Sequence, residues 1–193
     1  MKMTMAKSIN PNLNKSKKFE NFLTTLILFQ FIFCACDGFN WYGEIDPSDC
    51  DENDILVIKS IVSQSTDFIE WDMDVNFNGK IEALEVGWQF WEDGRLIHWI
   101  CADVPSPWYI YNYDCGLSGK IPPILTKLDK LEKLHFDKNN FSGEIPPEIC
   151  DLKVANKSDY WFRISDNKLC PPFPECVDET NLIQNSSDCY EKK

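Results

Sequence analysis

The chain has 193 residues, of which 44% are hydrophobic and 13% aromatic, and its formal net charge is −12. This apolar content is too high for a disordered chain and is sufficient for one packed domain. The acidic balance argues against a nucleic-acid partner, because phosphate backbones select basic surfaces.

Residues 1–35 are expected to be a signal peptide, followed by a linker at 36–50. A lysine-bearing start precedes the apolar run FLTTLILFQFIF at 22–33, which is too short to span a bilayer as a helix and matches the apolar segment of a signal peptide. We therefore predict a secreted or cell-surface protein. Its new N-terminus has two alternatives: simple cleavage, or a lipid anchor at Cys36, because residues 33–36 resemble a bacterial lipobox. That anchor would be the chain's contact with a membrane.

Residues 51–94 are predicted to form a helical cap. Acidic residues followed by apolar side chains on one helical face predict a helix over 51–65, and a second helix is predicted over 82–91, ended by Asp93-Gly94. Between them, DVNFNGKIEALE at 74–85 fits the D-x-[DN]-x-[DN]-G-x₅-E pattern of the EF-hand calcium loop.

Calcium prefers hard oxygen ligands, and this loop offers them at the EF-hand spacing. Glu82 would act through a water molecule, and the direct ligands would be the side chains or carbonyls of Asp74, Asn76, Asn78, Lys80 and Glu85. Two of these side chains are neutral amides, and no second loop is visible to pair with this one. The alternative is therefore a turn that keeps the loop's shape without an ion.

Residues 95–176 contain a repeat. LSGKIPP at 117–123 returns as FSGEIPP at 141–147, a period of 24 residues. Such a period is typical of a solenoid, whose units bury their apolar faces against one another. Leu134 and Phe136 predict a short strand with two inward side chains, and Phe162 and Ile164 the next one. Asn139 is expected to satisfy backbone groups at the bend.

The pattern LxxLxxLxLxxNxLSGxIPxxL, which residues 128–148 follow with only conservative departures, resembles the plant-type leucine-rich repeat. Residues 162–172 resemble a degenerate further copy. The resemblance implies an α/β repeat solenoid, a short leucine-rich repeat array with parallel strands on its concave face. A helical N-terminal cap would precede the array, and a disulfide-rich C-terminal cap with a tail at 177–193 would follow it.

Nine cysteines in a short exported chain indicate disulfides rather than a metal or redox site. Cys101 and Cys115 bracket an aromatic-rich insertion and are expected to be bridged. Cys50 would pair with Cys36 unless Cys36 carries a lipid. Four cysteines near the C-terminus would pair among themselves in one of three connectivities: Cys150, Cys170, Cys176 and Cys189.

The resemblance also implies that partners bind the concave face. If the strands align as predicted, the side chains on this face include His98, Ile100, Lys133, His135, Asp137, Trp161 and Arg163. The predicted function is recognition of a protein, peptide or glycan partner, with calcium as a stabilising ion. The alternative is a passive surface or matrix component. An enzyme is disfavoured, because the chain has two histidines and lacks GxSxG, HExxH and phosphate-loop motifs.

Overall fold

The computed structural model describes residues 36–39, 47–65, 73–74, 77–102, 115–155, 157–158 and 160–190. All described residues belong to one compact unit, residues 35–193. The predicted signal peptide, Asn76 and the aromatic insertion at 103–114 lie outside the described residues. No helix in the described ranges is long and apolar enough to cross a membrane.

The first predicted helix is α2 (Glu52–Val62). Asp51 caps its N-terminus, because its carboxylate accepts hydrogen bonds from the amides of Asn53 and Asp54. Val57, Ile58 and Ile61 lie on its buried face, whereas Leu56 is about half exposed. The helix contacts the 3₁₀ helix Pro123–Lys127 and so packs beside the first repeat.

The prediction of a second helix over 82–91 is wrong. The structure has one 3₁₀ turn at Ala83–Glu85 and then β2 (Trp88–Glu92), which forms an antiparallel hairpin with β3 (Arg95–Ile100). Asp93 and Gly94 have φ angles of 48° and 76°, the conformation that a two-residue hairpin turn requires. The Asp-Gly pair is thus a hairpin turn and not a helix end. The described part of the predicted cap at 51–94 contains one α-helix, a 3₁₀ turn and the first strand of a hairpin.

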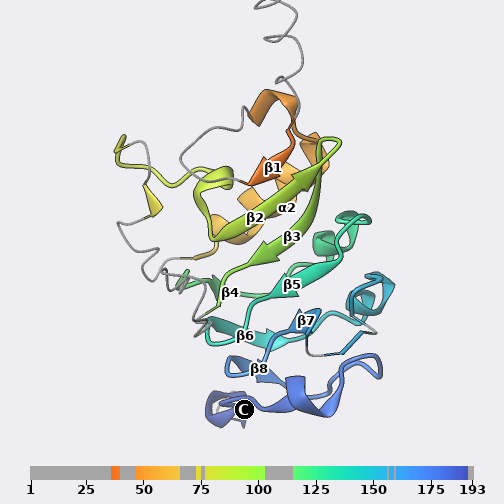
Figure 1. Cartoon of the computed structure of the whole chain (residues 1–193). Coiled ribbons are helices and arrows are strands. Elements are labelled where there is room, and N and C mark those ends of the chain that lie inside the picture. The colour runs from red at the N-terminus through yellow and green to blue at the C-terminus, as the bar shows by residue number, and fades with distance from the viewer. Residues whose placement is uncertain are drawn as a thin grey trace, which may run out of the picture. The chain divides into compact units, whose positions relative to one another are not determined.

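Two sets of strands build the repeats (Figure 1). The first sheet has the order β1-β2-β3-β5-β7, in which β1 (Gly38–Phe39) is antiparallel to β2, and β5 (Lys133–His135) and β7 (Phe162–Arg163) continue β3 in parallel. The second ladder contains β4 (Ser118–Gly119), β6 (Asn140–Glu144) and β8 (Lys168–Cys170), all parallel. The chain therefore has a repeat fold with parallel strands.

The repeats share one apolar interior. Trp99 pairs with Leu134, which pairs with Phe162, as the sequence alignment predicts. The Phe136 ring meets the Trp99 ring edge-on at 4.8 Å and lies 5.4 Å from the Phe141 ring. All the predicted inward residues are buried: Leu134, Phe136, Phe162 and Ile164.

Buried asparagines connect one repeat to the next. The Asn139 amide donates to the carbonyls of Cys101, Phe136 and Asp137 at 2.6, 3.1 and 3.2 Å, and its oxygen accepts from the Leu117 amide at 2.9 Å. Asn167 repeats this pattern one turn later: it donates to Phe136 and accepts from Phe141. Each asparagine therefore binds a carbonyl of the preceding repeat, in agreement with the structural role predicted for Asn139.

Two further amides close the C-terminal end. The Asn181 oxygen accepts from the Ile164 amide at 2.6 Å and its nitrogen donates to the Phe162 carbonyl, while Gln184 donates to Ile164 and accepts from the Asn167 amide. These side chains satisfy backbone groups that would otherwise need another strand. The sequence analysis missed them, because the 3₁₀ helix Glu179–Leu182 carries no repeat motif.

The structure contains four disulfides: Cys36–Cys50, Cys101–Cys115, Cys150–Cys176 and Cys170–Cys189. The bridge between Cys101 and Cys115 was expected. Of the three possible pairings of the four C-terminal cysteines, the structure has Cys150 with Cys176 and Cys170 with Cys189. Because the Cys36 sulfur is in a disulfide, the structure gives no support to a lipid anchor there.

Candidate functional site

The outward side chains of β2, β3, β5 and β7 form one face of the first sheet, here called the outer face. Trp91, Leu96, Trp99, Leu134 and Phe162 point inward and are buried, so the residues between them point outward. Across the strands, Phe90 pairs with His98, His98 with Lys133, Ile100 with His135, and His135 with Arg163. The structure thus brings His98, Ile100, Lys133, His135 and Arg163 together, with Trp161 just before β7 and Asp137 just after β5.

Aromatic rings are clustered on this face. The His98 ring lies 6.0 Å from Trp88 and 5.5 Å from Phe90 between centroids. Tyr160 is exposed and meets Trp161 edge-on at 4.9 Å, and the Lys133 Nζ lies 4.0 Å above the Tyr160 ring. The sequence analysis missed Trp88 and Phe90 because it expected a helix there. The available signal was the aromatic-rich run WQFWE directly before Asp93-Gly94, because aromatic residues favour strands and Asp-Gly favours a hairpin turn.

Two polar residues of the outer face, His135 and Asp137, are buried. The His135 Nε2 lies 2.9 Å from the Tyr160 carbonyl oxygen, and burial lowers the pKa of His135 to about 4, assisted by the charges of Lys133 and Arg163. The Asp137 carboxylate is fully buried and accepts from the Arg163 guanidinium. Burial raises the pKa of Asp137, and the Arg163 charge opposes that rise. Because its pKa is lowered to about 4, the His135 ring is neutral at physiological pH.

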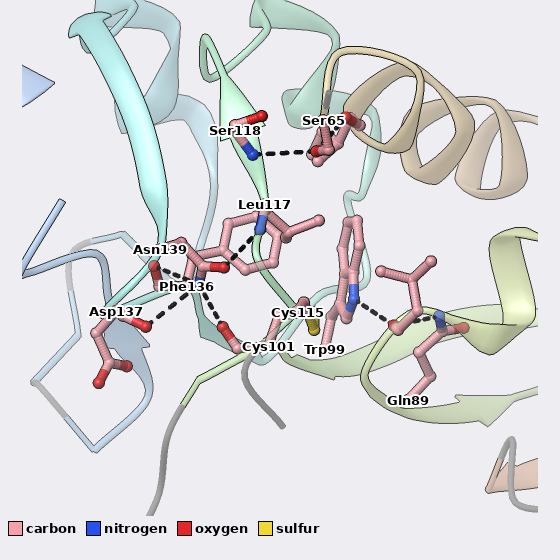
Figure 2. Close-up of a disulfide and its surroundings, with 12 residues drawn as sticks. Ser65, Gln89, Trp99, Cys101, Cys115, Leu117, Ser118, Phe136, Asp137 and Asn139 are labelled. Carbon is pink, nitrogen blue, oxygen red and sulfur yellow. Dashed lines mark hydrogen bonds between the residues drawn. A yellow bond between two sulfur atoms is a disulfide. The ribbon is translucent and has the colours of Figure 1, made fainter. Parts of the chain in front are cut away.

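Figure 2 shows what holds the strand ends in place. The Cys101–Cys115 disulfide lies beside Trp99, whose indole N–H donates to the Val86 carbonyl at 3.0 Å. Gly87 has φ +70°, and a Cβ there would lie 2.5 Å from the Cys101 Sγ, so this disulfide requires a glycine at position 87. The bridge joins the chain at Cys101, just after β3, to the chain at Cys115, just before β4.

A separate polar cluster joins α2 to the sheet. Both oxygens of the buried Asp54 accept from Arg95 at 2.9 Å, and one also accepts from the Leu96 amide at 2.9 Å. Arg95 also pairs with the exposed Asp129, and the hydrogen bond with Asp54 is the main reason that the pKa of Arg95 is raised. The Asp54 carboxylate is bound by Arg95 and by the Leu96 amide, two groups of the first sheet, so we assign this cluster a structural role.

The calcium-like loop is held by its own hydrogen bonds. The Asp74 carboxylate accepts from the amides of Asn78 and Gly79 at 2.9 and 2.7 Å, and the Glu85 carboxylate accepts from the Glu82 amide at 2.9 Å. Gly79 has φ +79°, as the turn requires. Among the described residues, no group of three or more histidine, cysteine, aspartate or glutamate side chains gathers as a metal site. The described part of the loop therefore has the expected turn, and the two predicted carboxylates, Asp74 and Glu85, accept hydrogen bonds from backbone amides.

Comparisons with known proteins agree with the repeat fold. The family described as Leucine Rich Repeat matches residues 130–152. The chain is 31% identical over 107 residues to an inactive leucine-rich repeat receptor-like serine/threonine-protein kinase of Arabidopsis thaliana, a match that covers 52% of this chain and 16% of that protein. No solved structure matches. These findings support a leucine-rich repeat protein, although the chain spans less than a fifth of that relative's length.

Proposed function

We propose that this leucine-rich repeat protein is an exported, non-catalytic module that recognises a protein or peptide partner through its outer face. The observation that carries the proposal is the cross-strand alignment of partly exposed aromatic and charged side chains from β2 to β7. Aromatic rings and guanidinium groups supply most of the binding energy at protein interfaces. In this proposal the outer face is the concave face of a short solenoid.

Export is supported by the cysteines. Four disulfides in one short chain suit an oxidising compartment outside the cytosol. We also propose that α2 with the β2–β3 hairpin caps the start of the array and that Asn181 and Gln184 cap its end. Terminal repeats need such covers, because their apolar side is otherwise exposed.

A passive surface or matrix component is the second candidate. The acidic composition favours it, since a net charge of −12 keeps a protein soluble and separate from its neighbours. A passive protein has no need of ordered aromatic side chains on one face, so binding experiments on that face separate the two candidates.

Replacing Trp161 by alanine is expected to weaken peptide binding about 10- to 100-fold, as the loss of a central aromatic contact does. Peptides would be selected from a displayed random library on the full oxidised chain, and their affinities for wild type and W161A compared by interferometry. Glu148→Ala is the matched control, because Glu148 is exposed on the 3₁₀ helix Pro147–Asp151 and not on the sheet. Equal affinities for W161A and wild type would remove Trp161 from the interface, and failure to select any peptide would favour the passive candidate.

We propose that loop 74–85 binds calcium weakly, through Asp74 and Glu85 together with the predicted amide and carbonyl ligands. With a dissociation constant of about 10⁻⁴ to 10⁻³ M, typical of extracellular sites, about 1 mM calcium should raise the free energy of unfolding by roughly 0.4–1.4 kcal/mol. Urea unfolding with calcium or with a chelator measures this difference. Glu85→Gln keeps an acceptor for the Glu82 amide but removes the charge, and it should abolish the calcium effect. An identical unfolding curve for wild type with and without calcium would show that the loop is only a turn.

A further inference from the structure

We propose that His135 and Asp137 form a recognition point for an uncharged hydrogen-bond donor, a hydroxyl or carboxamide group, of the bound peptide. This inference rests on the proposed function and adds the chemistry of the group that is recognised. It starts from two atoms. Among the described residues, the buried side-chain nitrogen and oxygen atoms without a hydrogen-bond partner are the His135 Nδ1 and the Asp137 Oδ1.

Both atoms are hydrogen-bond acceptors. The Tyr160 carbonyl can only accept, so the His135 Nε2 at 2.9 Å must carry the ring proton. The Nδ1 of the neutral ring is then a lone-pair acceptor. The Asp137 carboxylate is also an acceptor, and Arg163 uses only its Oδ2. Neither atom therefore has a donor among the described residues.

Both residues lie next to Arg163, which pairs with His135 across the strands and donates to the Asp137 carboxylate. Between them in sequence, Phe136 points into the core and is fully buried, so His135 and Asp137 both point to the opposite side. In Figure 2 the Asp137 carboxylate points away from Asn139 and from the Cys101–Cys115 disulfide. His135 is 5% exposed and Asp137 is 0% exposed. Buried acceptors without donors are rare in folded proteins and are unfavourable.

The surrounding charges select an uncharged donor. Lys133 lies on the same strand as His135, two residues before it, and Arg163 pairs with His135 across the strands, so a lysine or arginine of a partner would be repelled there. The Asp137 charge is already paired with Arg163. An anionic group, such as a carboxylate, has only acceptors and cannot donate a hydrogen bond to either atom. A neutral hydroxyl or amide carries a donor and has no positive charge, so it avoids both the repulsion and the lack of a donor.

In this proposal, side chains beside the pair move to give access. The described neighbours include Lys133, Tyr160 and Arg163, which are all partly or fully exposed. Long exposed side chains change rotamer within nanoseconds. The proposal therefore places the peptide group against the acceptors after a change of side-chain rotamers, with no change in the strand pairing of β5 and β7.

The experiment uses peptides selected on the full oxidised wild-type chain and resynthesised as isosteric pairs: asparagine against aspartate, and threonine against valine, at each position in turn. We expect one position at which the donor-bearing member binds about 10-fold or more tightly, which corresponds to one buried hydrogen bond to an ionic or strongly polar acceptor. Asp137→Asn presents an amide N–H₂ in place of the free oxygen while still accepting from Arg163. It should therefore reverse or abolish this preference.

Asp166→Asn is the matched control, because it removes the same charge from an exposed aspartate near Asp137, and it should keep the wild-type preference. If peptides bind but no position prefers the donor, or if Asp137→Asn keeps the preference, this inference is wrong while the proposed function stands. If no peptide binds, both are wrong. In the wild-type chain, the ¹⁵N signal of His135 Nδ1 should move to a hydrogen-bonded value when the peptide is added. An unchanged signal would also refute the proposal, whether or not the variants fold.

Discussion

Replacing Asn139 by alanine is expected to lower the free energy of unfolding by about 3–5 kcal/mol. The substitution removes one acceptor and two donors that serve the Leu117 amide and three carbonyls in the buried interior. An unsatisfied buried polar group costs about 1–3 kcal/mol, and these costs are not fully additive. Urea unfolding of the oxidised protein, followed by tryptophan fluorescence, measures the change.

The neighbouring Asn140→Ala is the control for this prediction, because Asn140 is exposed and its removal should change stability by less than about 0.5 kcal/mol. Asn139→Asp provides a sharper test. The carboxylate can still accept from Leu117, but it has no N–H to donate to the Cys101 carbonyl of the preceding repeat. We expect it to be destabilised nearly as strongly as N139A. A loss below about 1 kcal/mol for both variants would mean that the asparagine does not connect the repeats.

Replacing Asp54 by alanine is expected to lower the free energy of unfolding by about 2–4 kcal/mol. Removing one partner of a buried ion pair costs about 3–5 kcal/mol, because the remaining charge is left without compensation. The cost here is expected to be lower, since the Arg95 side chain is 22% exposed and keeps Asp129 as a partner. The Leu96 amide also loses its acceptor. Urea unfolding again provides the measurement.

Asp129→Ala is the matched control for Asp54, because it removes the other carboxylate from Arg95 at a position whose side chain is 62% exposed. Surface pairs contribute about 0–1 kcal/mol, so this variant should remain near wild-type stability. In a double-mutant cycle, D54A combined with R95A should be less destabilised than the sum of the single variants. Strictly additive losses would show that the pair does not act as a unit.

These two predictions concern the parts that hold the outer face in place. Asn139 fixes the bend immediately after Asp137, and Arg95 begins β3, the strand that carries His98 and Ile100. Binding measurements on outer-face variants are therefore interpretable only for proteins whose unfolding curves match wild type. For Trp161→Ala and Asp137→Asn, unfolding should be measured first.

The local and periodic features of this chain could be predicted from its sequence. The inward positions of Leu134, Phe136 and Phe162 and the alignment of β3 with β5 follow from a repeat in which each unit must bury the same side chains. The Cys101–Cys115 bridge was predicted because the two cysteines bracket an insertion in a chain expected to be exported. The set of outward residues follows from the same alignment, because side chains alternate along a strand. The start of α2 was marked by its acidic first turn.

Only the tertiary structure decided the remaining features, because they depend on which distant groups pack together. Trp88 and Phe90 belong to a strand because β3 is available to pair with β2, whereas their local sequence also suited a helix. Asp54 meets Arg95 across 41 residues, and Asn181 reaches back 17 residues to Ile164. The missing donors at His135 and Asp137 are likewise visible only when every neighbour is in place, since hydrogen-bond satisfaction is a property of the packed chain and not of a residue type.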